Sequence, residues 1–357
     1  MRILILSDLH LDKPRGELKK FDIEDAEVAI QSLGEYTEGI DAVVIAGDIF
    51  NATRVDSIPL HLLNMLGTQI KDIPQKYTIR GNHDRARFSI LEDMLGYTAL
   101  KPYENIDIGD GITISGCDFT DIDTHREYLS KATSDILLCH FPMSPFSTFS
   151  DLNISVNDCP EDRVVIVGDT HKPDVYAENN RCVISPGCLF PADKTEILSG
   201  HAGTGFILDI CKPSGNMSLQ LRPIWLKSRF GVDLSSIKTK DELLLGLKSI
   251  ELTGRFLTNL KPVVYVDPAL ADLDIPESTN DSIPEFEFIP VSKSTDDTGN
   301  LTADFGGLTG EDIDTRIRRI LATLYKESSD ADKLVEMTVD LITTDDPTAV
   351  LESYIRC

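Results

Sequence analysis

Short apolar runs that end in polar residues recur along about the first 230 residues of the chain. These runs span residues 2–8, 41–48, 76–84, 135–141, 163–169 and 182–187. They are rich in Val and Ile and have the length of strands that are buried on both faces. The stretches 23–36 and 57–70 have helical character, and each follows a run, as in a βαβ unit. The pattern predicts an α/β domain over residues 1–229.

A second, smaller α/β unit is expected over residues 230–270. Within it, residues 240–251 have the pattern of a helix and residues 261–267 that of a strand. Residues 271–310 are rich in Asp, Glu, Pro, Ser, Thr and Gly, which is typical of an irregular acidic linker.

The last segment, 311–357, has the pattern of short amphipathic helices. One apolar face repeats at helical spacing and consists of Ile313, Ile317, Ile320, Leu321 and Leu324. Helices this short that follow a linker have little core of their own. Two interpretations stay open: the helices pack on the main domain, or they bind a helix of a partner.

The net charge and the cysteine content limit the classes of protein to which the chain can belong. The chain carries 34 Lys and Arg against 59 Asp and Glu, a formal net charge of −25. This argues against a protein that coats nucleic acid or an anionic membrane. A nucleic-acid enzyme is still compatible, because a metal site supplies its own positive charge. Seven cysteines without a CxxC pair favour buried free thiols in a reducing compartment.

Two further features concern location. No apolar run approaches the roughly 20 residues that a membrane-spanning helix needs. The start of the chain, MRILILSDLH, has an Asp and a His where a signal peptide would continue apolar, so it predicts a first strand. Together with the free cysteines, these features predict a cytoplasmic protein without a membrane segment.

Five polar motifs lie at the ends of the predicted strands, where α/β folds assemble their sites. They are Asp8-Leu9-His10, Gly47-Asp48, Gly81-Asn82-His83-Asp84, His140 and Gly168-Asp169-Thr170-His171. Each motif alone could be a turn, a cap or a core histidine. Five in this order are difficult to explain as turns, and their oxygen and imidazole groups suit manganese, iron or zinc. The ligands suffice for two metal ions that share a carboxylate, an arrangement that hydrolyses phosphate esters.

In this order, the motifs resemble those of the calcineurin-like metallophosphoesterases, over about residues 1–230. Within that superfamily, residues 47–57 and 183–191 resemble segments of the SbcD-type DNA double-strand-break repair nucleases, a group that includes phage recombination nucleases. The resemblance implies a four-layer α-β-β-α sandwich with a small α/β capping domain and a C-terminal helical appendage.

The resemblance also implies roles for single residues. A first ion, expected to be Mn²⁺, would be held by Asp8, His10 and His171, a second by Asn82, His140 and Asp169, and Asp48 would bridge the two. His83 would stabilise or protonate the leaving oxygen. Asp84 would lie outside the ligand set and orient a histidine.

Other positions are expected to face the substrate. Arg80, Arg85 and Arg87 flank the site and are candidate phosphate contacts, although a solvated surface would explain them equally well. Asn51 stands where the group often has a histidine near the substrate. Asp169 stands where the superfamily usually has a histidine, which adds negative charge and favours harder ions.

The resemblance implies a manganese-dependent DNA exonuclease and endonuclease subunit in DNA repair and recombination. Its partners would be DNA, a coiled-coil ATPase of the SbcC type bound through the C-terminal helices, and a second copy of the chain. Residues 60–66 or 88–95 could form the dimer contact, or could be core. The alternative enzyme is a phosphodiesterase or phosphatase acting on a small molecule or protein. A scaffold with a vestigial site is a third possibility, against which the complete ligand set and His83 argue.

Overall fold

The structure is a computed structural model. It describes residues 1–11, 22–50, 60–84, 94–147, 154–189, 203–213, 217–228, 231–240, 243, 263–266 and 287–290. Several predicted features lie outside these residues: Asn51, Arg85, Arg87, the helical tail 311–357 and most of the dimer candidate 88–95.

The first of two large sheets carries the amino-terminal motifs. Its strand order is β12-β11-β1-β2-β3-β4. Strands β1 (Arg2–Leu6), β2 (Ala42–Ile45), β3 (Gln75–Thr78) and β4 (Thr98–Ala99) are parallel, with Leu4 opposite Val43 and Val44 opposite Tyr77. The later strands β11 (Thr204–Cys211) and β12 (Ser218–Trp225) close this sheet in antiparallel register. The carboxyl ends of β1, β2 and β3 therefore share one edge.

The second sheet carries the remaining motifs and has the order β5-β6-β7-β8-β10-β9. Its strands are β5 (Ile106–Gly109), β6 (Ile112–Cys117), β7 (Ile136–His140), β8 (Arg163–Gly168), β9 (Asp174–Glu178) and β10 (Arg181–Ser185). Strands β6, β7, β8 and β10 run parallel to one another, with His140 opposite Gly168. These central strands are continuous runs of apolar residues because both of their faces are covered.

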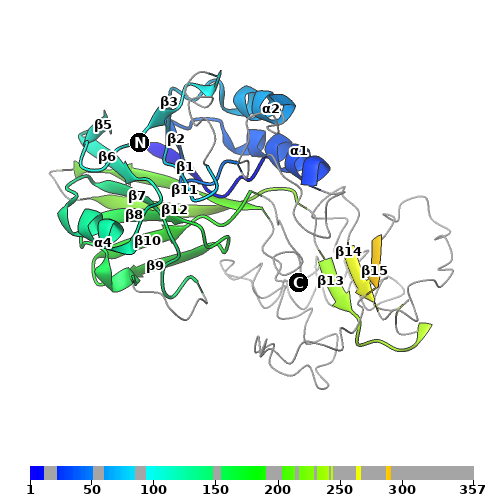
Figure 1. Ribbon diagram of the computed structural model, residues 1–357. Helices are drawn as coiled ribbons and strands as arrows, with labels where there is room; N and C mark the ends of the chain where they lie inside the picture. Colours follow the sequence, from blue (N-terminus) through cyan, green and yellow to red (C-terminus); the bar gives the residue numbers. More distant parts are fainter. Residues whose placement is uncertain are drawn as a thin grey trace, which may run out of the picture. The chain divides into compact units, whose positions relative to one another are not determined.

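Helices and sheets are joined by three layers of buried apolar side chains. Figure 1 shows the arrangement of the helices and the two large sheets. Helices α1 (Asp22–Leu33) and α2 (Leu60–Ile70) pack Ile30 and Leu66 against the outer face of the first sheet. A second apolar layer lies between the sheets, and a third joins α4 (Ile122–Lys131) to the outer face of the second sheet. Short 3-10 helices span Gly34–Tyr36 and Val156–Asp158. The predicted four-layer α-β-β-α sandwich is confirmed.

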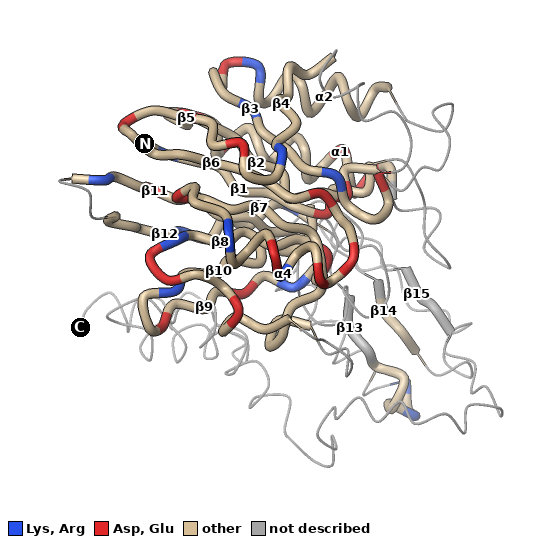
Figure 2. The backbone as a smooth tube through the Cα atoms, turned by 60° about the vertical axis from the view of Figure 1, so that its left-hand side comes forward, with Lys and Arg blue, Asp and Glu red and all other residues tan. Residues whose placement is uncertain are grey.

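Lys, Arg, Asp and Glu residues lie mainly along the loops and edges of this sandwich, and the central strand β7 contains none of them (Figure 2). None of the described helices is long and apolar enough to cross a membrane. In the described part of the chain the cysteines are free, and Cys117, Cys139, Cys159 and Cys188 are buried.

A separate three-stranded sheet contains β13 (Gly231–Leu234), β14 (Val263–Val266) and β15 (Glu287–Pro290) in that order. Strand β14 coincides with the strand expected over 261–267. Strand β15 occupies four positions within residues 271–310, for which the composition predicts a largely irregular linker. Of the helix expected over 240–251, only residues 240 and 243 are described. Contacts divide the chain into two compact units, and residues 1–233 belong to the first.

Candidate metal centre

The five motifs converge at the carboxyl ends of strands from both large sheets. Asp8 and His10 follow β1, Asp48 follows β2, and Asn82 follows β3. His140 is the last residue of β7, and Asp169 and His171 follow β8. The structure thus brings together seven groups that are spread over 164 positions, as predicted from their places at strand ends.

Five of the seven groups share an uncommon backbone conformation. Their φ angles are positive: 51° at Asp8, 44° at His10, 51° at Asp48, 85° at Asp169 and 52° at His171. Non-glycine residues rarely adopt this left-handed conformation, and where they do it often marks a functional site. Backbone hydrogen bonds hold the turns, since Asp8 N–H donates to Gly47 O (3.1 Å) and His10 N–H to Asp48 O (3.0 Å).

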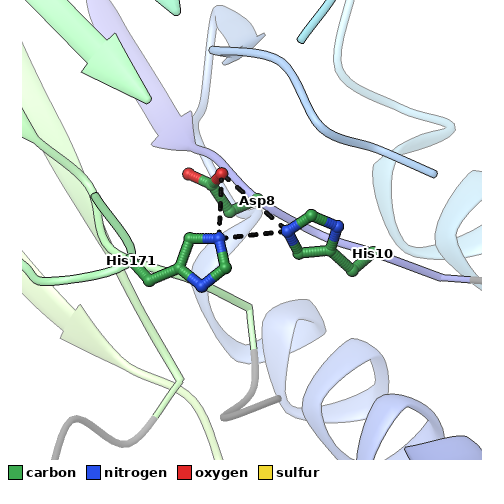
Figure 3. A group of neighbouring side chains, drawn as sticks. All are labelled: Asp8, His10 and His171. Carbon is green, nitrogen blue, oxygen red and sulfur yellow. Dashed lines mark hydrogen bonds and ion pairs between the residues drawn. The ribbon is translucent and has the colours of Figure 1, made fainter. Parts of the chain in front are cut away.

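Asp8, His10 and His171 form the first group of candidate ligands, with their polar atoms facing one another (Figure 3). The Nε2 atoms of the two imidazoles are 3.1 Å apart. Asp8 Oδ1 lies 3.4 Å from Nε2 of His171 and 4.0 Å from Nε2 of His10. This trio matches the ligand set predicted for the first ion.

Asp8, Asp48 and His140 form a second group, in which the ligand atoms lie within 4.8 Å of one another. His140 is fully buried, and its Nε2 lies 3.5 Å from Asp48 Oδ2 and 3.7 Å from Asp169 Oδ1. Its other nitrogen, Nδ1, lies 2.7 Å from the carbonyl oxygen of Ala46. Donation from Nδ1–H to this carbonyl leaves the Nε2 lone pair directed at the cluster, which is how protein histidines are prepared for metal binding.

The Asn82 amide tests whether these residues fit a cation. Its Oδ1 lies 3.0 Å from His140 Nε2 and faces both carboxylate oxygens of Asp48, at 3.1 and 3.3 Å. Acceptor atoms so close to one another repel, unless a cation lies among them or the amide turns to donate its hydrogens. Carboxylate, amide and imidazole groups gathered in a buried site are a donor set that divalent ions accept. The residues fit the two ions that the superfamily binds.

Asp48 lies at the middle of the cluster. Its Oδ2 is 3.7 Å from Nε2 of His10 and 3.5 Å from Nε2 of His140, and its Oδ1 accepts a 2.9 Å hydrogen bond from His83 N–H. Burial raises the pKa of Asp48, but its interactions with His140 and His83 outweigh burial and lower the pKa below the usual value. An ionised carboxylate between the two groups has the position that a bridging ligand needs.

The pKa of Asp169 is raised above its usual value. Burial raises this pKa, His140 opposes the rise, and the nearby carboxylates of Asp8 and Asp48 add to it. A divalent cation would relieve this accumulation of charge.

Glycine at position 81 allows the strand ends to approach closely. A Cβ atom there would overlap Oδ1 of Asp48 and lie 2.5 Å from its backbone nitrogen. The Gly81 backbone amide also donates a 2.9 Å hydrogen bond to Asp84. The glycine of the Gly81-Asn82-His83-Asp84 motif therefore makes room for the central carboxylate.

His83 stands at the edge of the cluster rather than inside it. Its side chain is 41% exposed, and its Nε2 lies 4.0 Å from Asp48 Oδ2. Its ring meets the ring of His10 edge to face, with centroids 5.4 Å apart. A half-exposed imidazole beside the buried ligands has the placement expected of a proton donor to a leaving group, and the role itself stays a prediction.

The structure corrects the role predicted for Asp84. Its buried carboxylate accepts hydrogen bonds from the backbone amides of Gly81 and Phe50, both at 2.9 Å, and no histidine among the described residues donates to it. Burial raises the pKa of Asp84 to about 7, the charge of Asp48 adds to this, and the two amides and His140 oppose it. Asp84 ties the turn after β3 to the loop after β2, so it positions backbone rather than an imidazole.

Features outside the motifs also shape the site, and the sequence analysis did not single them out. One is the backbone carbonyl of Ala46; since every residue carries such a group, the residue type gives no signal for its role. Another is Phe119, whose ring centroid lies 6.3 Å from that of His140. Among the predicted phosphate contacts, Arg80 is described and its side chain is 55% exposed.

The chain is similar to several known proteins of solved structure. A search of curated proteins finds no match. Among solved structures, vacuolar protein sorting 29 of Cryptosporidium parvum is 16% identical, covers 63% of this chain and 97% of its own, and has a TM-score of 0.32. A predicted phosphoesterase of Streptococcus pneumoniae is 15% identical, with 62% and 97% covered and a TM-score of 0.31. A putative 5'-nucleotidase of Staphylococcus aureus is 13% identical, with 68% and 56% covered and a TM-score of 0.40.

The family model for calcineurin-like phosphoesterases matches residues 1–201, which is more than half of the chain and includes all seven candidate ligands. The strand-end motifs, the sandwich and the convergent ligands lie within the same residues. The chain belongs to the calcineurin-like phosphoesterase family.

Proposed function

We propose that this chain is a manganese-dependent DNA nuclease that acts in repair or recombination together with a coiled-coil ATPase of the SbcC type. The observation that carries the proposal is the convergence of the ligand cluster with His83 at its exposed edge. Two divalent ions, when bound, neutralise the charge of a phosphodiester and lower the pKa of water for in-line hydrolysis.

The protein's own residues orient the substrate and supply a proton. Asp48 fixes the backbone of His83 through the hydrogen bond from His83 N–H, so the imidazole has a defined place beside the cluster. From that edge the ring can give its proton to the leaving oxygen, an effect typically worth about 10²–10⁴-fold in rate. We expect Arg80, three residues earlier, to contact a phosphate of the same strand.

Two sequence segments favour DNA as the substrate, because residues 47–57 and 183–191 resemble those of the SbcD-type nucleases. The second segment lies beside the metal loop, since Leu189 N–H donates to Asp8 O at 3.4 Å. The small three-stranded sheet and the tail 311–357 are additions that a minimal phosphatase does not need. We assign the tail to ATPase binding and expect the active form to be a homodimer.

Manganese is favoured by the composition of the ligand set. Three carboxylates, an amide and three imidazoles mix hard and borderline donors. Asp169 makes the set harder than the histidine that usually occupies this position in the family.

A phosphodiesterase or phosphatase for a small molecule or protein is the second candidate. The formal net charge of −25 favours it, because a strongly acidic chain repels the DNA backbone at long range. The family and the metal centre are compatible with both candidates.

One experiment separates them. The full chain with Mn²⁺ is offered linear duplex DNA, single-stranded DNA, a panel of nucleotides and a phosphopeptide, and each hydrolysis is followed by product analysis. We expect DNA to be cleaved with the highest kcat/KM, and His83→Ala to lose about 10²-fold or more of that rate while it still binds metal. His61→Ala is the matched control, because His61 is a half-exposed histidine of α2 that pairs with Glu27. Preferred hydrolysis of a nucleotide or the phosphopeptide would establish the second candidate instead.

A further inference from the structure

Phe119 is a large apolar side chain left 44% exposed beside the metal centre. It lies in the loop between β6 and α4. Its ring meets the ring of His140 at 73°, with centroids 6.3 Å apart. Since His140 is a buried residue of the cluster, the half-exposed ring of Phe119 lies at the margin of the site.

Hydrogen bonds on both sides fix the loop that carries this ring. Phe119 N–H donates to the carbonyl of Arg80 (2.8 Å), and Arg80 N–H donates to Asp118 Oδ1 (2.8 Å). On the other side, Thr120 N–H donates to Nε2 of the buried His125 (3.2 Å). A half-exposed aromatic on a loop held in this way is pre-organised, so little order would be lost when a ligand packs against it.

The surroundings of Phe119 combine three kinds of chemistry. The ring offers an apolar π-face, the Arg80 guanidinium a positive charge, and the cluster a place for divalent ions beside a phosphate. The cation lies close to this loop, because Arg80 Nε is 4.0 Å from Oδ2 of Asp118, the residue that precedes Phe119. A ligand that satisfies all three is planar and aromatic at one end and a phosphodiester at the other, which describes a nucleotide unit.

Resting on the proposed function, we infer that Phe119 is a base-stacking platform that makes this site specific for phosphodiesters that carry a nucleobase. The base next to the scissile phosphate packs on the ring, while Arg80 contacts the adjoining backbone. Stacking of this kind tolerates any base sequence, because every base has a π-face. The residue therefore selects a class of substrate and not a sequence.

The test compares a single-stranded oligonucleotide with an oligomer of equal length whose backbone is intact but whose bases are absent. Cleavage with Mn²⁺ is measured as kcat/KM, and fluorescence anisotropy measures binding of both oligomers without turnover. We expect the natural chain to favour the base-bearing oligomer by about 10-fold to 100-fold in both measurements, and Phe119→Ala to lose most of that preference. Phe119→Trp should keep it, because indole stacks as well as phenyl.

Tyr103→Ala is the matched control. Tyr103 is 50% exposed and also rests edge to face on a buried ring, that of Tyr128 at 5.7 Å, rather than on a metal-site residue. It should leave the preference unchanged. If Phe119→Ala instead lowers Mn²⁺ affinity and the cleavage of both oligomers equally, the ring only packs against His140 and the inference is wrong.

The outcomes separate this inference from the proposed function. Equal cleavage of both oligomers by the natural chain would overturn the platform while the nuclease proposal stands. Failure to cleave either oligomer, with hydrolysis of a nucleotide or phosphopeptide, would overturn the nuclease proposal. In that case the anisotropy preference still decides whether Phe119 binds a base.

Discussion

Replacement of Gly81 by alanine should weaken metal binding without unfolding the protein. The added Cβ would overlap Oδ1 of Asp48 and lie 2.5 Å from its backbone nitrogen, whereas real Cβ contacts essentially never fall below 3.0 Å. Because a backbone atom cannot swing aside, Asp48 must move by about 0.5 Å, and metal–ligand distances tolerate only about 0.2 Å. We expect Mn²⁺ affinity to fall by at least about 10–100-fold, the range seen when residues that support a ligand are altered.

Isothermal calorimetry with Mn²⁺ measures this loss, and a thermal melt in chelator shows that the variant is folded. Gly111→Ala is the matched control. Gly111 sits in the β5–β6 turn with φ of +71° and open space around it, so alanine there strains the backbone by about 1 kcal/mol and leaves the metal centre untouched. If Gly81→Ala binds Mn²⁺ as tightly as the natural chain, the close packing of Gly81 on Asp48 does not control the site and the reasoning fails.

The remaining predictions concern single groups and the tail. Asp48→Ala should lose both ions and all hydrolysis, and two fully occupied sites in anomalous scattering would refute the bridge. Asp169→His should raise activation by Zn²⁺ relative to Mn²⁺, because imidazole suits zinc better than carboxylate does; an unchanged metal profile would contradict this. Burial lowers the pKa of His125 from 6.5 to about 4, with the charge of His140 contributing, so the unfolded chain takes up a proton before the folded one. The associated stability is present above about pH 6.5 and is lost as pH falls toward about 4. Urea unfolding of the chelated protein measures this: between about pH 7 and pH 5 the natural chain should lose about 2 kcal/mol more unfolding free energy than His125→Gln. In that variant the side-chain oxygen can still accept the hydrogen bond from Thr120. Deletion of residues 311–357 should keep cleavage of small phosphodiesters and abolish binding of the ATPase in a pull-down, whereas a sharp fall in melting temperature with unchanged binding would show that the tail packs on its own core.

The ligand cluster could be predicted from the sequence because its signals are local. A motif such as Asp8-Leu9-His10 follows an apolar run directly, and parallel strands bring such ends to one edge. Asp84 was assigned the wrong partner for the same reason. Its neighbour in the motif is a histidine, but its carboxylate bonds the backbone of Phe50, which is 34 positions away and carries no side-chain signal.

Helix α4 and strand β15 show a different limit. The helix, IDTHREYLSK, buries only His125, Tyr128 and Leu129, so too few apolar positions repeat to reveal its period. Strand β15 has four residues and lies within an acidic stretch whose composition is that of a linker. Pairing with neighbouring strands decides whether a segment as short as β15 forms a strand, and the composition of the segment does not indicate that pairing.

The metal centre takes its ligands from two separately hydrogen-bonded sheets. Asp8, His10 and Asp48 follow strands of the first sheet, and His140 and His171 end or follow strands of the second. A layer of apolar side chains joins the facing sheets in the middle of the sandwich, and such contacts allow sliding more readily than directional bonds do. Bound ions would cross-link the two sheets at one edge, so that sliding one sheet past the other would require ligands to leave the metal. Chelation should consequently speed unfolding and open the sandwich to proteases from this edge first.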